Sequence, residues 1–305
     1  MAFTAKDVSA LRERTGCGMM DCKKALTEAD GDMEKAIEVL REKGLAKAAK
    51  KAGRIAAEGV AYAVVDPAKK AGVVIEVNAE TDFVAKNDQF KDLVNTCAKL
   101  VLEKNPATVE DLMALETEGK TVDALFKEKI MTIGENMKVR RFERLEGDLV
   151  SYIHAGGAIG VLVKFDTDVA DKEGFAQYAK DIAMQVAAMN PTYVRRDEIP
   201  AADVEKEKEI VIAEIKNDPK MASKPAQVIE KMVEGRLNKQ FFAVSCLEDQ
   251  QFVKGDKETV LQYTNQVAKQ LGGSIKIEKF IRYEKGEGIE KKVDDFAAEV
   301  ASMIK

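Results

Sequence analysis

The sequence predicts an α+β fold with a duplicated core, because one segment occurs twice and each copy has the pattern strand, turn, strand, loop, helix. Residues 58–106 recur as residues 146–191, with Glu58-Gly59 matching Glu146-Gly147 (146 − 58 = 88) and Gly72-Val73 matching Gly160-Val161 (160 − 72 = 88). Two such units side by side place helices on antiparallel strands.

The first copy is longer than the second in the loop that precedes its helix. Phe90 matches Phe175 (175 − 90 = 85) and Asn105-Pro106 matches Asn190-Pro191 (190 − 105 = 85), so the offset falls by three residues (88 − 85 = 3). The surplus lies within Asn78-Ala-Glu-Thr-Asp-Phe-Val-Ala-Lys86. Because the shorter copy achieves the same fold without it, we expect this loop to carry function.

Residues 1–44 predict a compact bundle of three short helices. Thr4 can cap the first helix, Asp21 is expected to cap the second, and Gly44 to end the third. From Leu45 to Arg54, basic residues alternate with alanines. This pattern predicts a helical linker whose basic face is solvated.

Each copy of the repeat then predicts two strands and a helix. The strands are expected at 60–65 and 73–77 in the first copy and at 150–153 and 161–165 in the second, where β-branched residues cluster. The helices have apolar residues three and four positions apart, and an Asn-Pro pair ends each one.

Residues 201–242 change in character to a charged helical pair. Val204, Val211 and Ile215 line the first helix, Asn217-Asp-Pro-Lys220 turns the chain, and the second helix has its apolar stripe from Val228 to Leu237. The two helices are expected to lie antiparallel as a projecting coiled-coil hairpin.

The remaining chain predicts a return to the core and a terminal helix. Within residues 243–284, a polar linker ending at Lys257 precedes a helix at 259–271 and a strand at 274–283, which can join the core sheet. Within residues 285–305, an apolar stripe from Ile289 to Met303 predicts a last helix that docks on another surface.

Composition excludes several classes of function. The chain has 305 residues, 33% of them charged, and no apolar run near the roughly 18 residues that span a bilayer. Its net charge of −5 has the wrong sign for a protein that binds nucleic acid by neutralising phosphates. We therefore expect no direct nucleic-acid partner and no membrane partner. The start lacks an export signal, so we expect a cytoplasmic location.

Signatures of cofactor binding and metal binding are missing. The sequence has no P-loop, no glycine fingerprint of a dinucleotide-binding fold and no zinc-protease motif, so no cofactor is expected. Cys17, Cys22, Cys97 and Cys246 form no CxxC pair and have no histidine pair nearby. They are interpreted as reduced thiols rather than metal ligands.

No catalytic residue is predicted. His154 is the only histidine and lies in a predicted turn, where a contact role or a polar turn role is favoured over catalysis. Asp82 could pair with Glu80 or Asp88 as an acid and base, but a solvated acidic loop is the favoured interpretation.

Two apolar features leave their roles open. Phe83, in the surplus loop, must either fold back into its own core or project to a partner. Met19 and Met20 are adjacent, so they cannot both face one small core, and flexible thioethers suit adaptable binding surfaces. We expect at least one of the two methionines to contact a partner.

Four motifs occur in order along nearly the whole chain. They are residues 11–26 (LRERTGCGMMDCKKAL), residues 78–86 (NAETDFVAK), Ile133-Gly-Glu-Asn136 with Arg140-Arg141, and Phe280-Ile-Arg-Tyr-Glu284 with Gly286-Glu-Gly288. Together they closely resemble the bacterial translation elongation factor Ts family.

The resemblance implies an organisation of the chain. It implies a ubiquitin-associated-like helical domain at residues 1–54 and a duplicated core at 55–145 and 146–200. It further implies a coiled-coil hairpin for dimerisation at 201–242, the rest of the core at 243–284, and a C-terminal helical module at 285–305.

The resemblance also implies an activity without covalent chemistry: binding the GTPase elongation factor Tu with GDP and promoting release of GDP. The family's magnesium-displacing loop falls on Thr81, Asp82, Phe83 and Val84. Its other contact positions fall on Met19, Met20, Ile133, Gly134 and His154, and on the C-terminal helix.

Two other classes of function remain as alternatives. The loop at Met19 and Met20 would suit a module that binds ubiquitin-like proteins, and pull-down of ubiquitin rather than a GTPase would favour it. An enzyme using Asp82 and His154 is the other alternative, which turnover of a small substrate would favour.

Overall fold

In the computed structural model, which describes residues 3–290, the duplicated segments form two three-stranded antiparallel sheets with the orders β1-β2-β5 and β6-β7-β8. The strands are β1 Glu58–Asp66, β2 Ala71–Ala79, β5 Met137–Glu146, β6 Asp148–His154, β7 Ile159–Thr167 and β8 Ile275–Glu284. Helices α5 (Asp88–Lys104) and α8 (Phe175–Met189) follow the second strand of each sheet. The α+β prediction is confirmed.

The duplication extends to backbone irregularities. The ladders shift register between Glu76 and Val77 in β2 and between Lys164 and Phe165 in β7, again 88 residues apart (164 − 76 = 88). Helix α5 ends at Asn105 with φ of 49°, and α8 ends at Asn190 with φ of 45°. Asparagine tolerates this left-handed conformation better than most side chains do. These details support a common origin of the two copies.

The third strands of the two sheets come from different places in the chain. Strand β5 follows the first copy directly, whereas β8 pairs with β7 only after the helical hairpin has intervened. The prediction that the strand near residues 274–283 joins the core is therefore confirmed.

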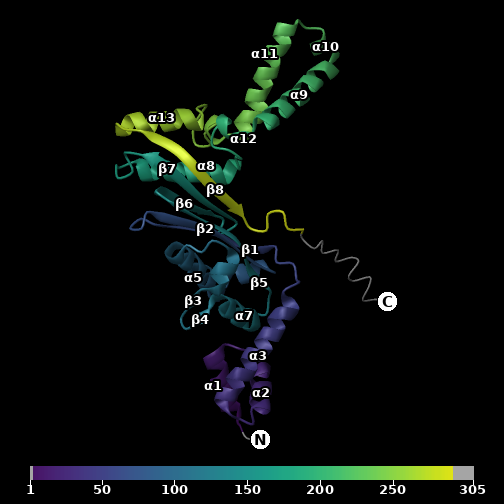
Figure 1. Ribbon diagram of the computed structural model, residues 1–305, viewed down its shortest axis with the longest axis vertical. Coiled ribbons are helices and arrows are strands. Elements are labelled where there is room, and N and C mark those ends of the chain that lie inside the picture. Colours follow the sequence, from purple (N-terminus) through teal and green to yellow (C-terminus); the bar gives the residue numbers. More distant parts are fainter. Residues whose placement is uncertain (1–2, 291–305) are drawn as a thin grey trace.

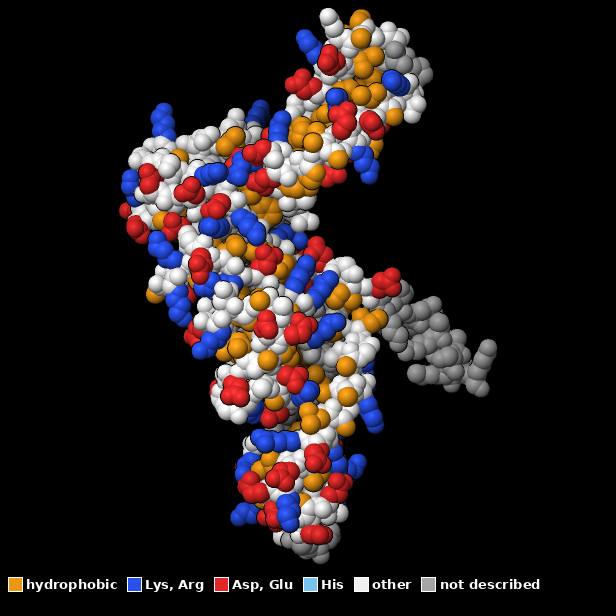
Figure 2. All heavy atoms as spheres, in the orientation of Figure 1, with side chains coloured by type: hydrophobic (Ala, Val, Ile, Leu, Met, Phe, Trp, Pro, Cys, Tyr) orange, Lys and Arg blue, Asp and Glu red, His pale blue; other side chains and the backbone are white. Residues whose placement is uncertain are grey.

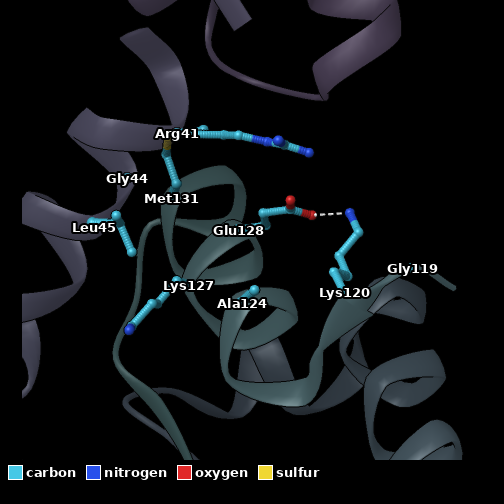
Figure 3. Close-up of a pocket in the computed structure, with 9 residues that line it drawn as sticks. All are labelled: Arg41, Gly44, Leu45, Gly119, Lys120, Ala124, Lys127, Glu128 and Met131. Atoms are coloured by element: carbon cyan, nitrogen blue, oxygen red, sulfur yellow. Dashed lines mark hydrogen bonds and ion pairs between the residues drawn. The ribbon is translucent and has the colours of Figure 1, made fainter. Parts of the chain in front are cut away.

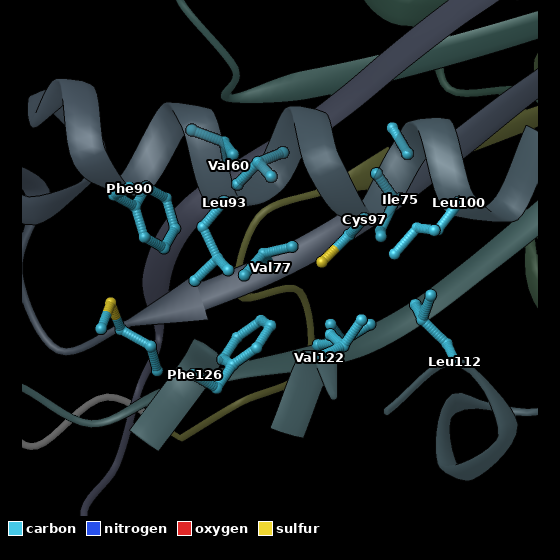
Figure 4. Packing of buried hydrophobic residues seen from close by; sticks show 14 of the residues in the cluster. Val60, Ile75, Val77, Phe90, Leu93, Cys97, Leu100, Leu112, Val122 and Phe126 are labelled. Atoms are coloured by element: carbon cyan, nitrogen blue, oxygen red, sulfur yellow. The ribbon is translucent and has the colours of Figure 1, made fainter. Parts of the chain in front are cut away.

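Helices cover the outer face of each sheet, and the sheets face each other (Figure 1). Between the first sheet and helices α5 and α7 (Val122–Ile133), Phe90, Leu93, Cys97 and Phe126 pack on Val77 (Figure 4). The second sheet packs an equivalent aromatic cluster beneath α8. Strand β2 is therefore covered on both faces and buried along its whole length.

Glycines allow the sheets to approach closely. A Cβ at Gly72 would lie 2.8 Å from Leu162 Cδ1, and a Cβ at Gly160 would lie 2.9 Å from the Ala61 carbonyl oxygen. The two glycines occupy equivalent positions in the copies, since 160 − 72 = 88. The repeated Gly-Val landmark thus reflects sheet-on-sheet packing.

The N-terminal bundle has three helices, as predicted, but two boundary signals were wrong. The helices are α1 Ala5–Thr15, α2 Met19–Glu28 and α3 Met33–Lys51. Asp21 lies inside the first turn of α2, whose N-cap residue is Gly18 and which has no side-chain cap. Gly44 does not end α3; it is buried, and a Cβ there would lie 2.9 Å from Met131 Sδ. This glycine serves helix packing instead.

The basic linker is part of α3, and several of its cations contact other parts of the chain. Lys47 forms an ion pair of 2.9 Å with Asp21, and Lys51 donates a hydrogen bond to the Gly134 carbonyl. Arg54 reaches Glu80 at 3.5 Å. These contacts join the bundle to the first half of the core, while Lys50 and Arg54 remain exposed, so the basic face is solvated as predicted.

The remaining helices and strands complete the first half of the core and form the hairpin. They are α4 Asp82–Lys86, α6 Val109–Ala114, β3 Glu116–Thr117, β4 Lys120–Thr121, α9 Ala201–Asn217, α10 Pro219–Ala222, α11 Ala226–Arg236 and a π-helix at Leu237–Phe242. In Figure 1 the hairpin of α9 and α11 projects from the second half of the core. Val211, Ile215, Val233 and Leu237 form its own small apolar cluster. Val228, placed on the stripe from sequence, is exposed.

The segment after the hairpin is packed, which corrects the prediction of a polar linker. Leu247 and Phe252 are buried in the second core, and the Gln250 side chain is buried as well, accepting a hydrogen bond of 3.1 Å from Gln185. The segment includes α12 Ala243–Ser245 and a short 3-10 turn at Leu247–Asp249, and leads to α13 Val260–Leu271. Another 3-10 turn, Arg196–Glu198, lies before the hairpin.

The predicted last helix, from Ile289 to Met303, falls outside the described residues except for its first two positions. Over residues 3–290, no helix combines the length and the apolar character needed to cross a membrane.

Candidate functional site

The surplus loop presents one aromatic side chain to solvent. Phe83 lies on the one-turn helix α4 and is 80% exposed. The next residue, Val84, is 5% exposed and belongs to the core beneath the first sheet. The question that the sequence left open is therefore answered, because Phe83 projects outward while Val84 anchors the turn.

Asp82 is held by its own helix. Its carboxylate accepts a hydrogen bond of 2.7 Å from Lys86 Nζ, and this bond holds the pKa of Asp82 below its ordinary value. The Lys86 ammonium also lies 5.9 Å from the centre of the Phe83 ring. The exposed turn thus combines one aromatic ring, one carboxylate and one ammonium group.

Two carboxylates bind this turn to the loop that follows α7. Glu135 accepts hydrogen bonds from the Thr81 backbone N–H (2.9 Å) and the Thr81 hydroxyl (2.8 Å). In the opposite direction, Glu80 accepts one from the Asn136 backbone N–H at 2.6 Å. We call Glu80, Thr81, Glu135 and Asn136 the carboxylate clasp. It brings the motif around Thr81 against Ile133-Gly-Glu-Asn136, two motifs more than 50 residues apart in sequence.

Ile133 and Gly134 lie at the end of α7, next to the carboxylate clasp. Ile133 is half-buried against the first core, and Gly134 ends the helix with φ of 92°. The Asn136 side chain, which is buried, donates to the backbone carbonyls of Ala52 (3.4 Å) and Arg54 (2.9 Å). The carboxylate clasp therefore also fixes the end of the N-terminal linker.

His154 is exposed at the end of β6, in the turn that leads to β7. Its Nδ1 lies 3.1 Å from the Tyr152 hydroxyl. Lys285 donates its backbone N–H to the Ala158 carbonyl in this turn (3.0 Å), and Ala61 in β1 donates its backbone N–H to the Gly157 carbonyl (2.8 Å). Helix α4 also contacts β1, so the turn of His154 and the surplus loop both border this strand.

No hydrogen bond in the described chain joins His154 to Asp82. Asp82 is bonded to Lys86, and His154 is bonded to Tyr152. This arrangement does not favour an acid–base pair of the two residues.

Met19 and Met20 lie apart from these segments, at the start of α2 in the N-terminal bundle (Figure 1). They are 43% and 62% exposed, so neither fills the small core of the bundle. Their exposure leaves two adjacent thioethers on the surface.

A buried carboxylate that sequence reasoning missed organises the remaining motifs. Glu76 in β2 has no exposed surface, and accepts hydrogen bonds from Arg140 (3.0 Å), Arg141 (2.7 Å) and the Gly286 backbone N–H (2.8 Å). We call Glu76, Arg140, Arg141 and Gly286 the Glu76 cluster. Its signal in the sequence was a glutamate between valines and isoleucines in an otherwise apolar strand.

The electrostatics of the Glu76 cluster favour the ionised carboxylate. Burial by itself would raise the pKa of Glu76, but hydrogen bonds from Asn78, Gly286 and the two arginines outweigh it and lower the pKa below the ordinary 4.5. Arg141 continues to Glu287 at 3.0 Å and stacks 4.1 Å from the Tyr283 ring. The Gly286-Glu-Gly288 motif is thereby held against the first sheet.

No metal site emerges from the described residues. Within residues 3–290, no three His, Cys, Asp or Glu side chains gather as metal ligands, and all four cysteines are buried free thiols. A cavity of about 240 Å³ lies between α3 and α7, where Lys120 pairs with Glu128 (Figure 3). None of the site residues predicted from the sequence lines it.

Comparison of the sequence with known proteins shows the family of this chain. The model of the family described as Elongation factor TS matches residues 80–287. The chain is 50% identical over 311 residues to Elongation factor Ts of Trichlorobacter lovleyi, covering 99% of this chain and 98% of that protein. The chain belongs to the elongation factor Ts family.

Other relatives agree over the same span. Elongation factor Ts of Clostridium botulinum is 49% identical over 308 residues, covering 99% of this chain and 98% of its own. Elongation factor Ts of Clostridium perfringens is 50% identical over 305 residues, covering 99% of both chains. The resemblance noted from four motifs thus extends over nearly the whole chain, and identifies a translation factor of the elongation factor Ts family.

The family motifs meet in space at two places in this member of the elongation factor Ts family. The carboxylate clasp joins residues 80–86 to residues 133–136, and the Glu76 cluster joins Arg140-Arg141 to Gly286-Glu-Gly288. Motifs distant in sequence are therefore two contacting pairs in the fold.

Proposed function

We propose that this chain binds elongation factor Tu with GDP and promotes release of GDP by displacing the magnesium ion of that GTPase, so that GTP can bind. The observation that carries the proposal is the exposure of Phe83, 80% of which faces solvent on a turn anchored by Val84. An aromatic ring held outward in this way is apolar surface that a partner can bury with a gain in binding free energy.

The physical mechanism requires only a small displacement in the partner. Mg²⁺ demands near-octahedral oxygen ligands at about 2.0–2.1 Å, so an aromatic ring inserted beside its site removes much of its hold on the phosphates. Phe83 supplies the ring, and Asp82 and Lys86 supply charges at its base. No proton transfer and no covalent bond enter this mechanism, so the protein is an exchange factor and not an enzyme.

Binding energies make the exchange a cycle. A factor that weakens the affinity of the GTPase for nucleotide is itself weakened by nucleotide to the same extent, because the coupling is reciprocal. Incoming GTP therefore expels the factor. Because the coupling is reciprocal, excess Mg²⁺ should also weaken binding of the factor and slow the GDP release that it promotes.

The finer organisation belongs to the same proposal. Residues 1–54 would form the ubiquitin-associated-like domain and present Met19 and Met20, and Ile133, Gly134 and His154 would extend the contact surface around Phe83. Residues 201–242 would form the coiled coil for a homodimer, and residues 285–305 the C-terminal module. The proposal involves no nucleic acid and no membrane, and it implies a cytoplasmic location.

Charge on the surface fits a protein partner. Acidic and basic side chains are interspersed over the face shown in Figure 2, where hydrophobic side chains also gather along the hairpin. The net charge is −5. Association through phosphate neutralisation is therefore not part of the proposal.

The deciding experiment measures release of a fluorescent GDP from elongation factor Tu beside thermal unfolding of the same variants. Phe83→Ala should unfold like the wild type, because its ring is outside the core, and should lose most of the acceleration. Asp82→Ala should lose less. Leu261→Ala, which removes an exposed apolar side chain from α13, is the matched control and should exchange normally.

Two results would contradict the proposal. If Phe83→Ala melts the first core, the residue is structural. If it unfolds normally and exchanges at full rate, the displacing group lies elsewhere, and Ile133 and His154 are the next residues to test.

A further inference from the structure

The helix that presents Phe83 is too short to orient it. Helix α4 has five residues, and an isolated turn of helix is unstable in water because nucleation costs more than its few hydrogen bonds return. The direction of the Phe83 ring must therefore be set by the residues on either side of α4.

One side of α4 is anchored by burial. Val84 and Ala85 are buried in the first core, and Asn87 caps the following helix by accepting the Gln89 backbone N–H at 2.8 Å. These contacts hold the end of the turn that follows Phe83. They leave its beginning, at Thr81, to be fixed by something else.

The beginning of the turn is held by Glu135. Thr81 is the N-cap residue of α4, yet its side chain makes no hydrogen bond to its own helix. Instead, the Thr81 hydroxyl and backbone N–H both donate to the two oxygens of Glu135, at 2.8 and 2.9 Å. Hydrogen bonds to a charged acceptor are about twice as strong as neutral ones. A bidentate contact also restricts rotation.

Glu135 is itself rigidly placed. It follows Gly134, whose carbonyl accepts from Lys51, and precedes the buried Asn136, whose backbone N–H donates to Glu80. Glu80 is in turn adjacent to Thr81. The two chain segments therefore exchange carboxylate contacts in both directions, which fixes their relative position.

We propose that Glu135 is a positioning residue for nucleotide exchange: through Thr81 it orients Phe83 and joins the Phe83 turn and the Ile133-Gly134 segment into one pre-ordered surface. The inference rests on the proposed function of Phe83 and extends it. Without Glu135, binding would have to order the turn at the moment of contact, and the exchange step would slow.

Four variants test the role. Glu135→Ala removes both acceptor oxygens, whereas Glu135→Gln keeps a carbonyl for the Thr81 N–H and an amide that can bond the hydroxyl. Thr81→Val removes only the hydrogen bond from the hydroxyl, whereas Thr81→Ser keeps the hydroxyl. Glu128→Ala, on helix α7 that precedes Glu135 and paired with Lys120, is the matched control carboxylate.

Two measurements are made on each full-length variant: the rate of GDP release from elongation factor Tu at saturating factor, and hydrogen–deuterium exchange at the Thr81 amide without the partner. For Glu135→Ala we expect faster amide exchange and a roughly tenfold slower release rate, since small displacements of a positioned group commonly cost this much or more. Glu135→Gln and Glu128→Ala should release GDP within about twofold of the wild type. Thr81→Val should fall between these two and Glu135→Ala, and Thr81→Ser should release GDP faster than Thr81→Val.

The result that overturns the inference is a Glu135→Ala protein with faster Thr81 amide exchange and an unchanged release rate. If Glu135→Ala does not fold, Thr81→Val decides, and a full release rate with that variant overturns the inference equally. Phe83→Ala separates this failure from failure of the proposed function. A slow Phe83→Ala beside a fast Glu135→Ala rejects only the positioning role, whereas a fast Phe83→Ala rejects the function on which it rests.

Discussion

At the scale of single residues, buried residues that stabilise the fold alternate with apolar residues that are exposed to solvent. Phe83 and Val84 are neighbours in sequence, yet one is 80% exposed and the other 5%. Met19 and Met20 are likewise exposed, while the next apolar positions of the bundle, Cys22 and Leu26, are fully buried. Substitutions at the exposed positions should therefore change binding more than stability.

Replacing Met19 and Met20 by alanine tests this separation in the N-terminal bundle. We expect the double variant to keep its helicity and melting temperature, because neither side chain fills the bundle core. Association with elongation factor Tu, measured by calorimetry, should weaken by about 1 to 3 kcal/mol. Met33→Ala, which removes a side chain packed on the bundle core, is the control and should lower stability instead. An unchanged affinity of the double variant would reject a contact role.

Glu76 shows the opposite case, a residue that contacts only its own chain. Its depressed pKa means that its ionised form stabilises the fold at neutral pH. As the pH falls below the unfolded value near 4.5 the contribution decreases, and it is lost once the pH passes the folded pKa.

Glu76→Gln should therefore destabilise the protein by about 3 kcal/mol at pH 7, because Arg140 and Arg141 lose their buried counter-charge. Urea unfolding at pH 7 and at pH 4 and below measures both effects. The stability difference between wild type and variant should shrink in acid. An acid-independent difference would show that the carboxylate charge is not what stabilises the cluster.

At the scale of elements, the hairpin has its own apolar cluster and is tied to the core at its base. Its helices α9 and α11 pack around Ile215 and Val233, and Arg196 binds both Asp249 and Asn238 where the two chain segments meet the core. The π-helix at Leu237–Phe242 marks the same base. Such irregular turns are common at functional positions within helices.

Excising residues 203–240 and joining the ends with a short glycine-rich link should leave a folded core. We expect this deletion to accelerate GDP release almost as the wild type does, since the carboxylate clasp and Phe83 lie in the other half of the core. Circular dichroism verifies folding, and sedimentation measures any loss of self-association. A well-folded deletion without activity would place the hairpin in the active surface.

At the scale of the whole molecule, the chain consists of parts whose cores are separate. The N-terminal bundle, the two halves of the core and the hairpin each have their own apolar cluster. A fifth cluster, which includes Ala61, Val74 and Leu162, joins the two sheets. Figure 1 shows these parts following one another along the long axis. Their stabilities can therefore be followed separately.

The cysteines report on three of these parts. Cys17 and Cys22 lie in the bundle, Cys97 lies in the first half of the core, and Cys246 lies next to the second half. Burial raises the pKa of all four thiols, that of Cys97 to about 12 and that of Cys246 to about 11. We expect no rapid reaction with a disulfide reagent at pH 8. In a urea series, the thiols should become reactive as their own part unfolds, which mass spectrometry of labelled peptides resolves. Rapid labelling of Cys97 in native protein would contradict its burial.

Much of this architecture was predictable from local patterns. The structure confirms the helices and strands predicted from the repeat at an offset of 88, from the helical periodicity after each strand pair and from the Asn-Pro ends. These predictions succeed because secondary structure follows from the spacing of apolar residues along one segment. The same comparison located the surplus loop that contains Phe83. The four motifs identified the family for the same reason, since each is a continuous run of residues.

The sequence could not determine the features that depend on contacts with residues far away in the same chain. Gly44 resembles a helix stop, yet it is buried because Met131 packs against it. Glu76 was missed because a charge in an apolar strand is stable only where Arg140, Arg141 and the Gly286 N–H meet it, and these groups lie 64 or more residues away. Whether Phe83 faces the core or solvent was open for the same reason. Only the tertiary structure decided it, through the burial of Val84 and the bonds from Thr81 to Glu135.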